Sequence, residues 1–259
     1  MTADDPVLLD VDGAIATVTL NRPRARNALT FAMYERLAEI CRTLPADGPV
    51  RALVVTGAGD KAFAAGTDIG QFRDFRSKED ALAYEERIES VLTAIETCPV
   101  PTIAAIAGAC TGGGLGIAVA CDLRIAARGS SFGFPIARTL GNCLSLANCA
   151  RLAALIGSGR VMEAIFTARL IEAEEARQIG LISEVLDDRD AVSARAHELA
   201  TTVAGHAPLT LRATKEALRR VRLGRQDGSD LIAMCYMSED FREGIEAFLA
   251  KRRPQWEGR

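Results

Sequence analysis

Short, wholly apolar runs alternate with helical segments along most of this chain, and glycine follows the apolar runs. Residues 51–56 (RALVVT) are predicted to form a buried strand that stops at Gly57, and residues 102–107 (TIAAIA) a second strand that leads into the glycine-dense segment 108–116. A strand that is apolar on both faces must be covered on both faces, which is the usual state of a parallel sheet. The alternation therefore predicts an α/β fold with a largely buried sheet.

The remaining segments fit around that sheet. Residues 7–11 and 14–20 are rich in β-forming side chains and are joined by Asp12-Gly13, so the pattern predicts an opening hairpin. The other expected elements are helices over residues 30–44 and 77–96, short helices within 145–178, strands over 123–126 and 181–186, and helices from about residue 188 onward.

Charge and composition disfavour several classes of protein. The 259 residues are 49% hydrophobic and 25% charged, which is typical of a globular chain and not of a disordered one. Lys and Arg number 31 against 34 Asp and Glu, so the net charge of -3 provides no field that would attract a polyanion. Nucleic acid is therefore not an expected partner.

The histidines and cysteines limit the chemistry further. The two histidines, His197 and His206, both lie late in the chain, which excludes an HExxH zinc site, and no metal is expected. The seven cysteines form no CxxC pair and lie in apolar segments, so they are predicted to be reduced thiols in a cytoplasmic protein. The acidic start and the lack of a long uncharged apolar stretch predict neither secretion nor membrane spanning.

Two segments place glycine where a backbone would approach a ligand. They are residues 62–69 (AFAAGTDI) and residues 108–116 (GACTGGGLG), the second of which lies between a strand and a helix. A helix N-terminus presents free N–H groups, and glycine removes the Cβ that would keep a ligand away, so this pattern favours anion binding. Close helix packing is the structural alternative. A dinucleotide fingerprint does not fit, because glycine would be needed at Cys110 or Ile117.

Taken with other motifs, these segments give the chain a family resemblance. The motifs, in chain order, are NRP (21–23), NAL (27–29), AFAAGTDI (62–69), PTIAAIAGACTGGGLGIAVACDLRIAA (101–127), SSFGFP (130–135) and SEDFREGIEAFLAKRRPQW (238–256). In these motifs the chain resembles the enoyl-CoA hydratase/isomerase family, the crotonase superfamily. The resemblance implies a crotonase-like spiral of ββα repeats with a C-terminal helical trimerisation region. The division it suggests is an acyl-CoA-binding core over residues 1–195 and a helical oligomerisation region over 196–259, in a homotrimer or a hexamer of paired trimers.

The resemblance also assigns roles to residues. It implies that the backbone N–H groups of Thr67 and Gly113 form an oxyanion hole for the thioester oxygen of an acyl-CoA, with each donor worth on the order of 3 kcal/mol. Coenzyme A would belong to the substrate, and no separate cofactor is expected. Lys251 and Trp256 resemble C-terminal residues that reach a neighbouring subunit's CoA, with an exposed tail as the alternative. The substrate-binding residues implied are Arg24, Arg26, Ala65, Thr67, Asp68, Ile69, Gly70 and Gly113.

The chain departs from the family at the two positions where hydratases carry acid and base. The resemblance places one glutamate two residues after the GGG run, where this chain has Gly116, and the other after FGxP, where it has Ile136. Neither side chain can transfer a proton, and hydration needs such groups to activate water and protonate carbon. Ordinary hydratase activity is therefore not expected.

Other residues could supply the chemistry, each with a structural alternative. Arg138 could bind an acidic acyl group, Asn142 could position water, and Cys143 could be a nucleophile, although a thiol without a nearby histidine is more often inert. Asp68 and Asp122 are predicted to be structural. Glu85, Glu86 and Glu89 lie on a helix that can border the acyl pocket, with a solvated helix face as the alternative.

The sequence thus predicts a CoA-thioester lyase or isomerase that stabilises an enolate. Two other functions remain open at this point. One is an acyl-CoA-binding homologue without catalysis, and the other is a nicotinamide-dependent oxidoreductase, which the failed fingerprint disfavours.

Overall fold

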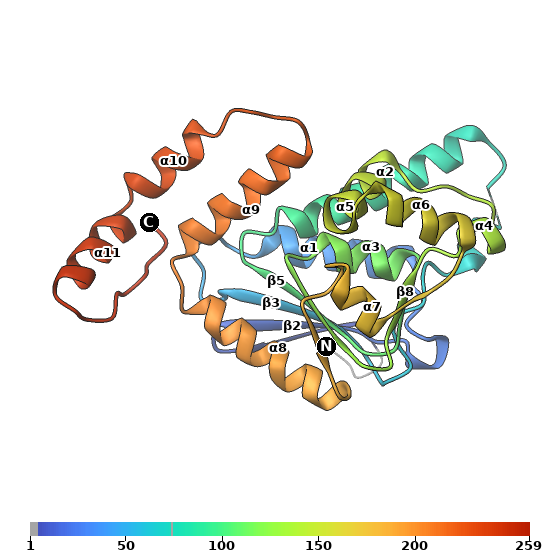
Figure 1. Cartoon of the computed structure of the whole chain (residues 1–259), viewed down its shortest axis with the longest axis horizontal. Helices are drawn as coiled ribbons and strands as arrows, with labels where there is room; N and C mark the ends of the chain where they lie inside the picture. The colour runs from blue at the N-terminus through green and yellow to red at the C-terminus, as the bar shows by residue number, and fades with distance from the viewer. Residues whose placement is uncertain (1–4, 74) are drawn as a thin grey trace.

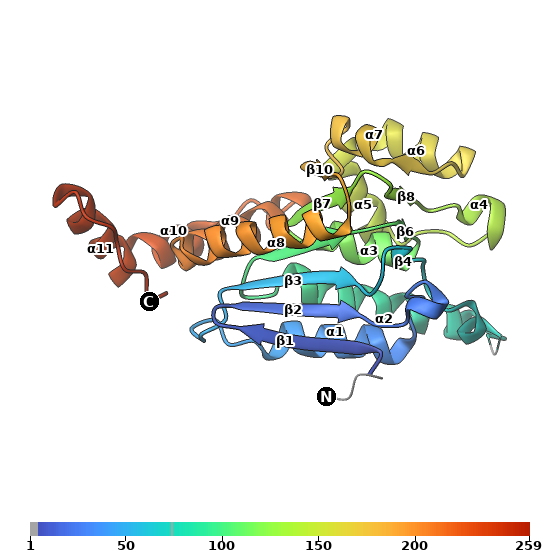
Figure 2. The same cartoon turned by 90° about the horizontal axis from the view of Figure 1, so that it is seen from below.

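The computed structural model describes residues 5–73 and 75–259, and its largest element is a six-stranded sheet (Figures 1 and 2). The strand order is β1-β2-β3-β5-β7-β10, with β1 and β2 antiparallel, as the predicted hairpin requires, and the remaining neighbours parallel. The strands are β1 (Val7–Asp12), β2 (Ile15–Leu20), β3 (Ala52–Gly57), β5 (Thr102–Ile106), β7 (Leu123–Ala127) and β10 (Glu184–Leu186).

A second sheet of very short strands carries the loops that concern function. Its order is β4-β6-β8-β9, and its strands are β4 (Ala62–Ala64), β6 (Ala109–Thr111), β8 (Ser131–Gly133) and β9 (Ile171–Glu172). Strands β3, β5 and β7 of the large sheet are each followed by one short strand of the small sheet and then by a helix. This is the predicted series of ββα repeats, and it brings the segments after β4, β6 and β8 to one end of the molecule.

The helices begin where the sequence provides caps. Thr30 caps α1 (Phe31–Thr43), since its Oγ1 accepts a hydrogen bond from Met33 N at 3.3 Å, and Ser77 with Asp80 forms a capping box on α2 (Lys78–Glu96). The other helices are α3 (Gly113–Ala120), α4 (Ile136–Thr139), α5 (Leu146–Ile156), α6 (Ser158–Thr167), α7 (Ala173–Gln178), α8 (Arg189–Ala204), α9 (Pro208–Arg222), α10 (Ser229–Tyr236) and α11 (Glu239–Leu249), with short 3-10 helices η1 (Pro23–Ala25) and η2 (Ile69–Phe72).

The large sheet has a hydrophobic core on each face, as its apolar strands predicted. Along β3, Leu53 and Val55 join the core formed with α1, α2 and α3, whereas Ala52 and Val54 join a smaller core under α8. Successive strand residues point to opposite faces, so a run without polar residues can serve both cores. Figure 1 shows α8 along one face of the sheet and α1 and α3 along the other.

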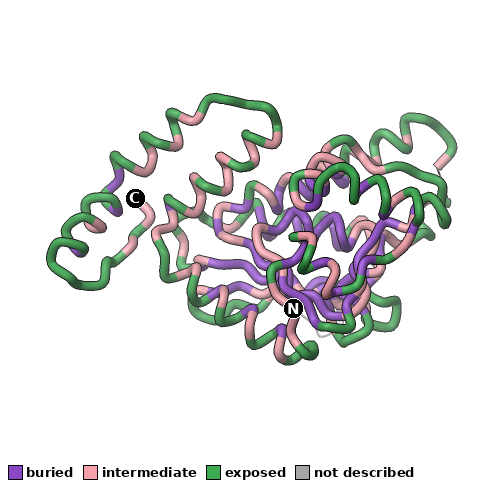
Figure 3. The backbone as a smooth tube through the Cα atoms, in the orientation of Figure 1, coloured by how far each residue is buried: buried purple, intermediate pink, exposed green. Residues whose placement is uncertain are grey.

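The last three helices extend away from the two sheets as an arm, here defined as residues 207–259 (Figures 1 and 3). Within it, α10 has no buried residue, and Leu209 is the buried residue of α9. The division after residue 195 stays a prediction. In the structure, α8 continues across that position, and its residues Val192, Ala196 and Ala200 pack on the sheet.

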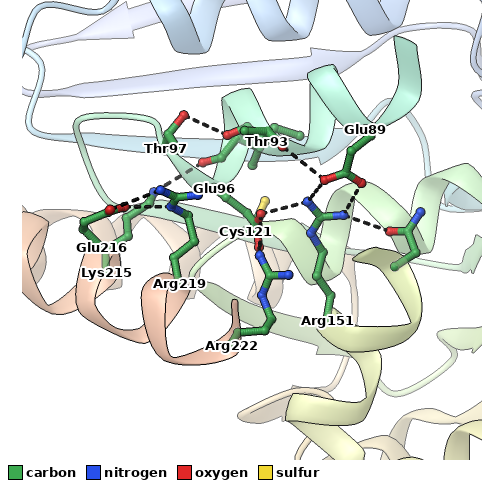
Figure 4. A network of polar contacts seen from close by, with 12 residues as sticks. Glu89, Thr93, Glu96, Thr97, Cys121, Arg151, Lys215, Glu216, Arg219 and Arg222 are labelled. Carbon is green, nitrogen blue, oxygen red and sulfur yellow. Dashed lines mark hydrogen bonds and ion pairs between the residues drawn. The ribbon is translucent and has the colours of Figure 1, made fainter. Parts of the chain in front are cut away.

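Ion pairs attach the base of the arm to α2 (Figure 4). Arg222 of α9 donates to Glu96 Oε1 at 2.7 Å, and Arg151 of α5 donates to Glu89 Oε2 and Glu96 Oε2 at 2.8 Å. Lys215 of α9 pairs with Asp122 at 2.7 Å. Asp122 also accepts hydrogen bonds from the backbone N–H and the hydroxyl group of Thr102 at the start of β5. These contacts agree with its predicted structural role.

No helix in the part of the chain that the structure describes is both long enough and apolar enough to cross a lipid bilayer.

Candidate active site

The first glycine segment is held in place by the loop that precedes α1. Asn27 is fully buried in the left-handed region at φ 55°, and its Nδ2 donates to the carbonyls of Ala58 at 3.0 Å and Ala62 at 2.7 Å. Beyond it, Leu29 N donates to Gly66 O, and Asp68 N to Leu29 O, both at 2.8 Å. These bonds fix the backbone on either side of Thr67. In this local parallel pairing, the N–H of Thr67 itself points away from Leu29.

The second glycine segment turns sharply between β6 and α3 and touches the first. Gly112 has φ 52° and ψ -125°, a backbone conformation that is strained for any residue with a side chain. A Cβ built on Gly112 would also lie only 3.3 Å from Gly66 Cα. Gly66 is also in the positive-φ region, at 107°. The two glycines therefore allow the two backbones to meet at van der Waals distance.

The amides of Thr67 and Gly113 are left free at this junction. Gly113 is the first residue of α3, so its N–H has no acceptor within the helix. Among the residues that the structure describes, neither the Thr67 N–H nor the Gly113 N–H donates to a protein acceptor. Both residues line the same cavity, which has a volume of about 230 Å³.

The cavity contains several of the predicted site residues. Its wall combines the two glycine segments with η2, α2, α3, the start of α4 and the loop after it, and most of the lining surface is apolar. The predicted residues that line it are Ala65, Thr67, Ile69, Gly113, Gly116, Ile136, Asn142 and Cys143.

Other predicted site residues lie outside the cavity wall. Arg24 and Arg26 are exposed in and beside η1, and Arg138 is exposed on α4. Asp68 caps η2 by accepting from Gly70 N at 3.2 Å and pairs with Arg22 at 3.1 Å, which agrees with its predicted structural role. The parts of Arg24, Arg26, Asp68 and Gly70 in substrate binding stay predictions.

Lys251 and Trp256, at the C-terminal end, lie in the arm. Lys251 is exposed at φ 53°, and Trp256 packs on Gly244 of α11, where a built Cβ would lie 3.2 Å from the indole.

Gly116 and Ile136 leave their part of the cavity without an ionisable group. A Cβ built on Gly116 would meet the Leu92 Cδ1 methyl at 3.6 Å, so aliphatic carbon from α2 covers that position. Ile136 is buried at the first turn of α4.

A chain of three hydroxyl groups lies behind the Thr67 amide. Thr67 Oγ1 is 2.9 Å from the Tyr34 hydroxyl of α1 and 3.1 Å from the Tyr84 hydroxyl of α2. Tyr34 is fully buried, and burial, with lesser contributions from its neighbours, raises its pKa far above the usual value. Burial likewise raises the pKa of Tyr84, so both phenols stay protonated at neutral pH. The sequence analysis assigned no role in the site to Tyr34 or Tyr84.

The ionisable groups of the cavity are few. Glu85 is half-buried in the wall, and burial followed by the negative charge of Glu89 raises its pKa. Glu89 is bound to Arg151, and Glu86 is exposed. Cys143 is exposed at the cavity edge, and neither histidine lines the wall. No group of three or more potential metal ligands occurs among the described residues.

Fold and site together define a class of protein: an α/β chain of ββα repeats in which two glycine segments present free amides over an apolar cavity. Comparison with known proteins gives this class a family. The profile of the Enoyl-CoA hydratase/isomerase family matches residues 10–259. The chain belongs to this family.

Individual relatives match over nearly their full length. The chain is 35% identical to a probable enoyl-CoA hydratase of Bacillus subtilis, with 97% of this chain and 98% of the relative covered. It is 32% identical to the short-chain-enoyl-CoA hydratase of Clostridium acetobutylicum, with 95% of each covered. Among solved structures, an enoyl-CoA hydratase/carnithine racemase from Magnetospirillum magneticum matches with a TM-score of 0.90 at 36% identity, covering 98% of this chain and 96% of that one.

Proposed function

We propose that this protein binds an acyl-CoA thioester and stabilises its enolate by hydrogen bonds from the N–H groups of Thr67 and Gly113. The observation that carries the proposal is the pair of unpartnered amides on one cavity wall. Both residues are partly exposed in the cavity wall, and two N–H groups without a protein acceptor at one point are suited to a ligand that brings a strong acceptor. The family membership supports a thioester as that ligand.

The proposed chemistry follows from where charge develops. Removing a proton from the carbon next to a thioester moves negative charge onto the carbonyl oxygen. Donors that are already oriented stabilise that oxygen without reorganisation, and losing one such donor in other enzymes costs about 3 to 4 kcal/mol. The mostly apolar wall lowers the local dielectric constant and so strengthens these bonds.

Hydration of a 2-enoyl thioester is not the reaction we propose. Gly116 and Ile136, where the family resemblance expects acids, supply only hydrogen and hydrocarbon to the cavity. A lyase or isomerase step that proceeds through the enolate requires the oxyanion hole but not this pair of acids.

Calorimetric titration with butyryl-CoA, free CoA and NAD tests binding, and a crotonyl-CoA hydration assay tests the reaction. We expect butyryl-CoA to bind more tightly than free CoA, NAD not to bind, and hydration to be negligible. Binding of NAD without a response to CoA thioesters would support the oxidoreductase alternative. Binding of butyryl-CoA without any enolate chemistry would support the non-catalytic alternative.

We also propose that the arm joins copies of this chain into trimers, which can pair as hexamers. Supporting this, the arm encloses an apolar groove of about 430 Å³, and large hydrophobic side chains are exposed along the arm. Exposed apolar patches of this kind mark interaction surfaces. The exposed residues are Leu218, Val221, Leu223, Ile232, Tyr236, Met237, Phe241, Ile245, Phe248 and Leu249. A cytoplasmic location and the division after residue 195 are kept as predictions.

A further inference from the structure

The cavity has one carboxyl group in its wall. Of the residues that line it, all of which the structure describes, only Glu85, Tyr84 and Cys143 carry a titratable side chain. Both glycine segments and the positions of Gly116 and Ile136 contribute none. Glu85 is therefore the only carboxyl of the described wall that could accept a proton from a bound ligand.

Glu85 also takes part in no structural interaction, unlike other acidic residues on the same helix. Asp80 is used in the capping box at the start of α2, Glu89 binds Arg151, and Glu96 binds Arg151 and Arg222. In the described part of the chain, the Glu85 carboxyl makes no hydrogen bond or ion pair. A half-buried carboxyl group without a partner lowers the stability of the fold. Its position in the cavity therefore indicates a role towards a bound ligand.

The helix places Glu85 on the face that closes the cavity. Glu85, Ile88 and Leu92 follow one another at spacings of three and four residues, so they share one side of α2, and all three line the cavity. Leu92 packs against the position of Gly116. The carboxyl thus enters from α2 into the cavity where α3 and α4 supply no acid.

We propose that Glu85 is the catalytic residue that transfers the α-proton of the bound acyl-CoA. The proposal rests on the function proposed above, because the thioester oxygen must be held by Thr67 and Gly113. The carboxylate takes the proton from the α-carbon, the C–H electron pair forms the C=C bond of the enolate, and the C=O pair moves onto the thioester oxygen. Return of the proton to the α-carbon gives exchange. For a 3-enoyl thioester, delivery to the γ-carbon moves the double bond to the 2-position, and no further reactant is needed.

The surroundings of Glu85 suit this role. Burial and the charge of Glu89 raise its pKa, which makes the carboxylate a stronger base. The other titratable groups nearby are Tyr84 on α2, Tyr34 on α1 and Cys143 on the loop after α4. Both phenols are protonated at neutral pH and therefore contribute no charge near Glu85.

The test is loss of the α-proton signal of butyryl-CoA in heavy water, followed by proton NMR, with binding measured by calorimetry. Glu85→Gln keeps the shape of the side chain, and Glu86→Gln, one residue along and exposed, is the matched control. We expect exchange by the wild-type protein and by E86Q, a loss of about 100-fold or more in E85Q, and similar butyryl-CoA affinity in all three. The wild-type rate should fall as the pH drops through the raised pKa of Glu85, and the residual E85Q rate should lack that step.

The possible failures are distinguishable. Wild-type exchange that persists in E85Q would overturn the role of Glu85 but leave the proposed function standing. Butyryl-CoA binding without exchange by the wild-type protein would overturn the role of Glu85 and support a passive binder. Absence of binding would overturn the proposed function and this inference with it.

Discussion

At the scale of single residues, Thr67 combines two tasks that use different atoms. Its N–H has no protein acceptor in the described part of the chain, and its hydroxyl bonds Tyr34 and Tyr84. Tyr34 has no other hydrogen-bond partner among the described residues, so we infer that its buried O–H donates to Thr67 Oγ1. Thr67 can then donate to Tyr84, which leaves the Tyr84 proton available to the cavity.

Substitution of Thr67 by Val tests this arrangement. The backbone amide is retained, but the fully buried Tyr34 hydroxyl loses its acceptor, and we expect the free energy of unfolding in urea to fall by about 1 to 3 kcal/mol. Adding Tyr34→Phe removes the orphaned group, so the double variant should recover part of the loss. A double variant whose loss equals the sum of the single losses would contradict the proposed bond.

Glu85 should make stability depend on pH in a direction opposite to that of a paired acid. Its pKa is raised in the folded protein above the unfolded value of about 4.3, so the folded state binds this proton more tightly. Stability contributed by this group is therefore present at low pH and is lost as the pH rises through the window between the two pKa values.

We accordingly expect Glu85→Gln to be more stable than the wild-type protein at pH 8, with the difference shrinking towards pH 4. Thermal unfolding at both pH values, with Glu86→Gln alongside, measures it. A Glu85→Gln variant that is less stable at pH 8 would show that the carboxylate has a stabilising partner.

At the scale of elements, α3 approaches the small sheet more closely than a side chain would permit. A Cβ built on Gly114 would lie 2.2 Å from the carbonyl oxygen of Ala64 in β4, whereas one built on Gly116 would make ordinary contact with Leu92 at 3.6 Å. The close approach on the Gly114 side brings Gly113 to Thr67. Gly114 thus allows the helix to pack closely on β4, whereas Gly116 lines the cavity.

This contrast predicts opposite outcomes for two alanine substitutions in the same helix. Gly114→Ala should lower the free energy of unfolding by about 1 to 3 kcal/mol, because a rigid backbone atom must move. Gly116→Ala should raise it by about 0.5 to 1 kcal/mol through helix propensity. Urea denaturation of both variants is the measurement, and equal effects would refute the packing argument.

The elements also show how far sequence patterns reach. The hairpin, the capped helices α1 and α2 and the parallel strands were predicted, since each has apolar runs or capping residues within its own segment. The short strands of the four-stranded sheet were implied only by the family resemblance and not by any pattern within their own segments. These strands have two or three residues, too few to show a period of two, and they exist only because the ββα repeats align them.

At the scale of the whole molecule, the arm exposes large apolar side chains of the kind that are usually buried in an interface. Phe248 is 83% exposed and Leu249 is 75% exposed, although both are large and apolar. Folding of one chain leaves them in water, and burial of such side chains contributes about 1.5 to 3 kcal/mol each.

Substitution of Phe248 by Asp should therefore shift the protein from the proposed trimer to a monomer in sedimentation-velocity measurements. The control is Val11→Asp, a change at an exposed position on the edge strand β1, far along the chain from the arm. A wild-type protein that sediments as a monomer would refute the proposed assembly.

The sequence by itself determined the family, the alternation of strands and helices, and the two glycine segments. Each of these depends on motifs or patterns formed by residues that are close together in the chain. The tertiary structure decided which residues share the cavity: it placed Tyr84 and Glu85 in the wall and left Glu86 and Arg138 outside, and it buried the Tyr34 hydroxyl against Thr67. The physical reason is that a partner 33 residues away, such as Thr67 for Tyr34, is fixed by how helices pack on sheets and leaves no periodic signal in the chain.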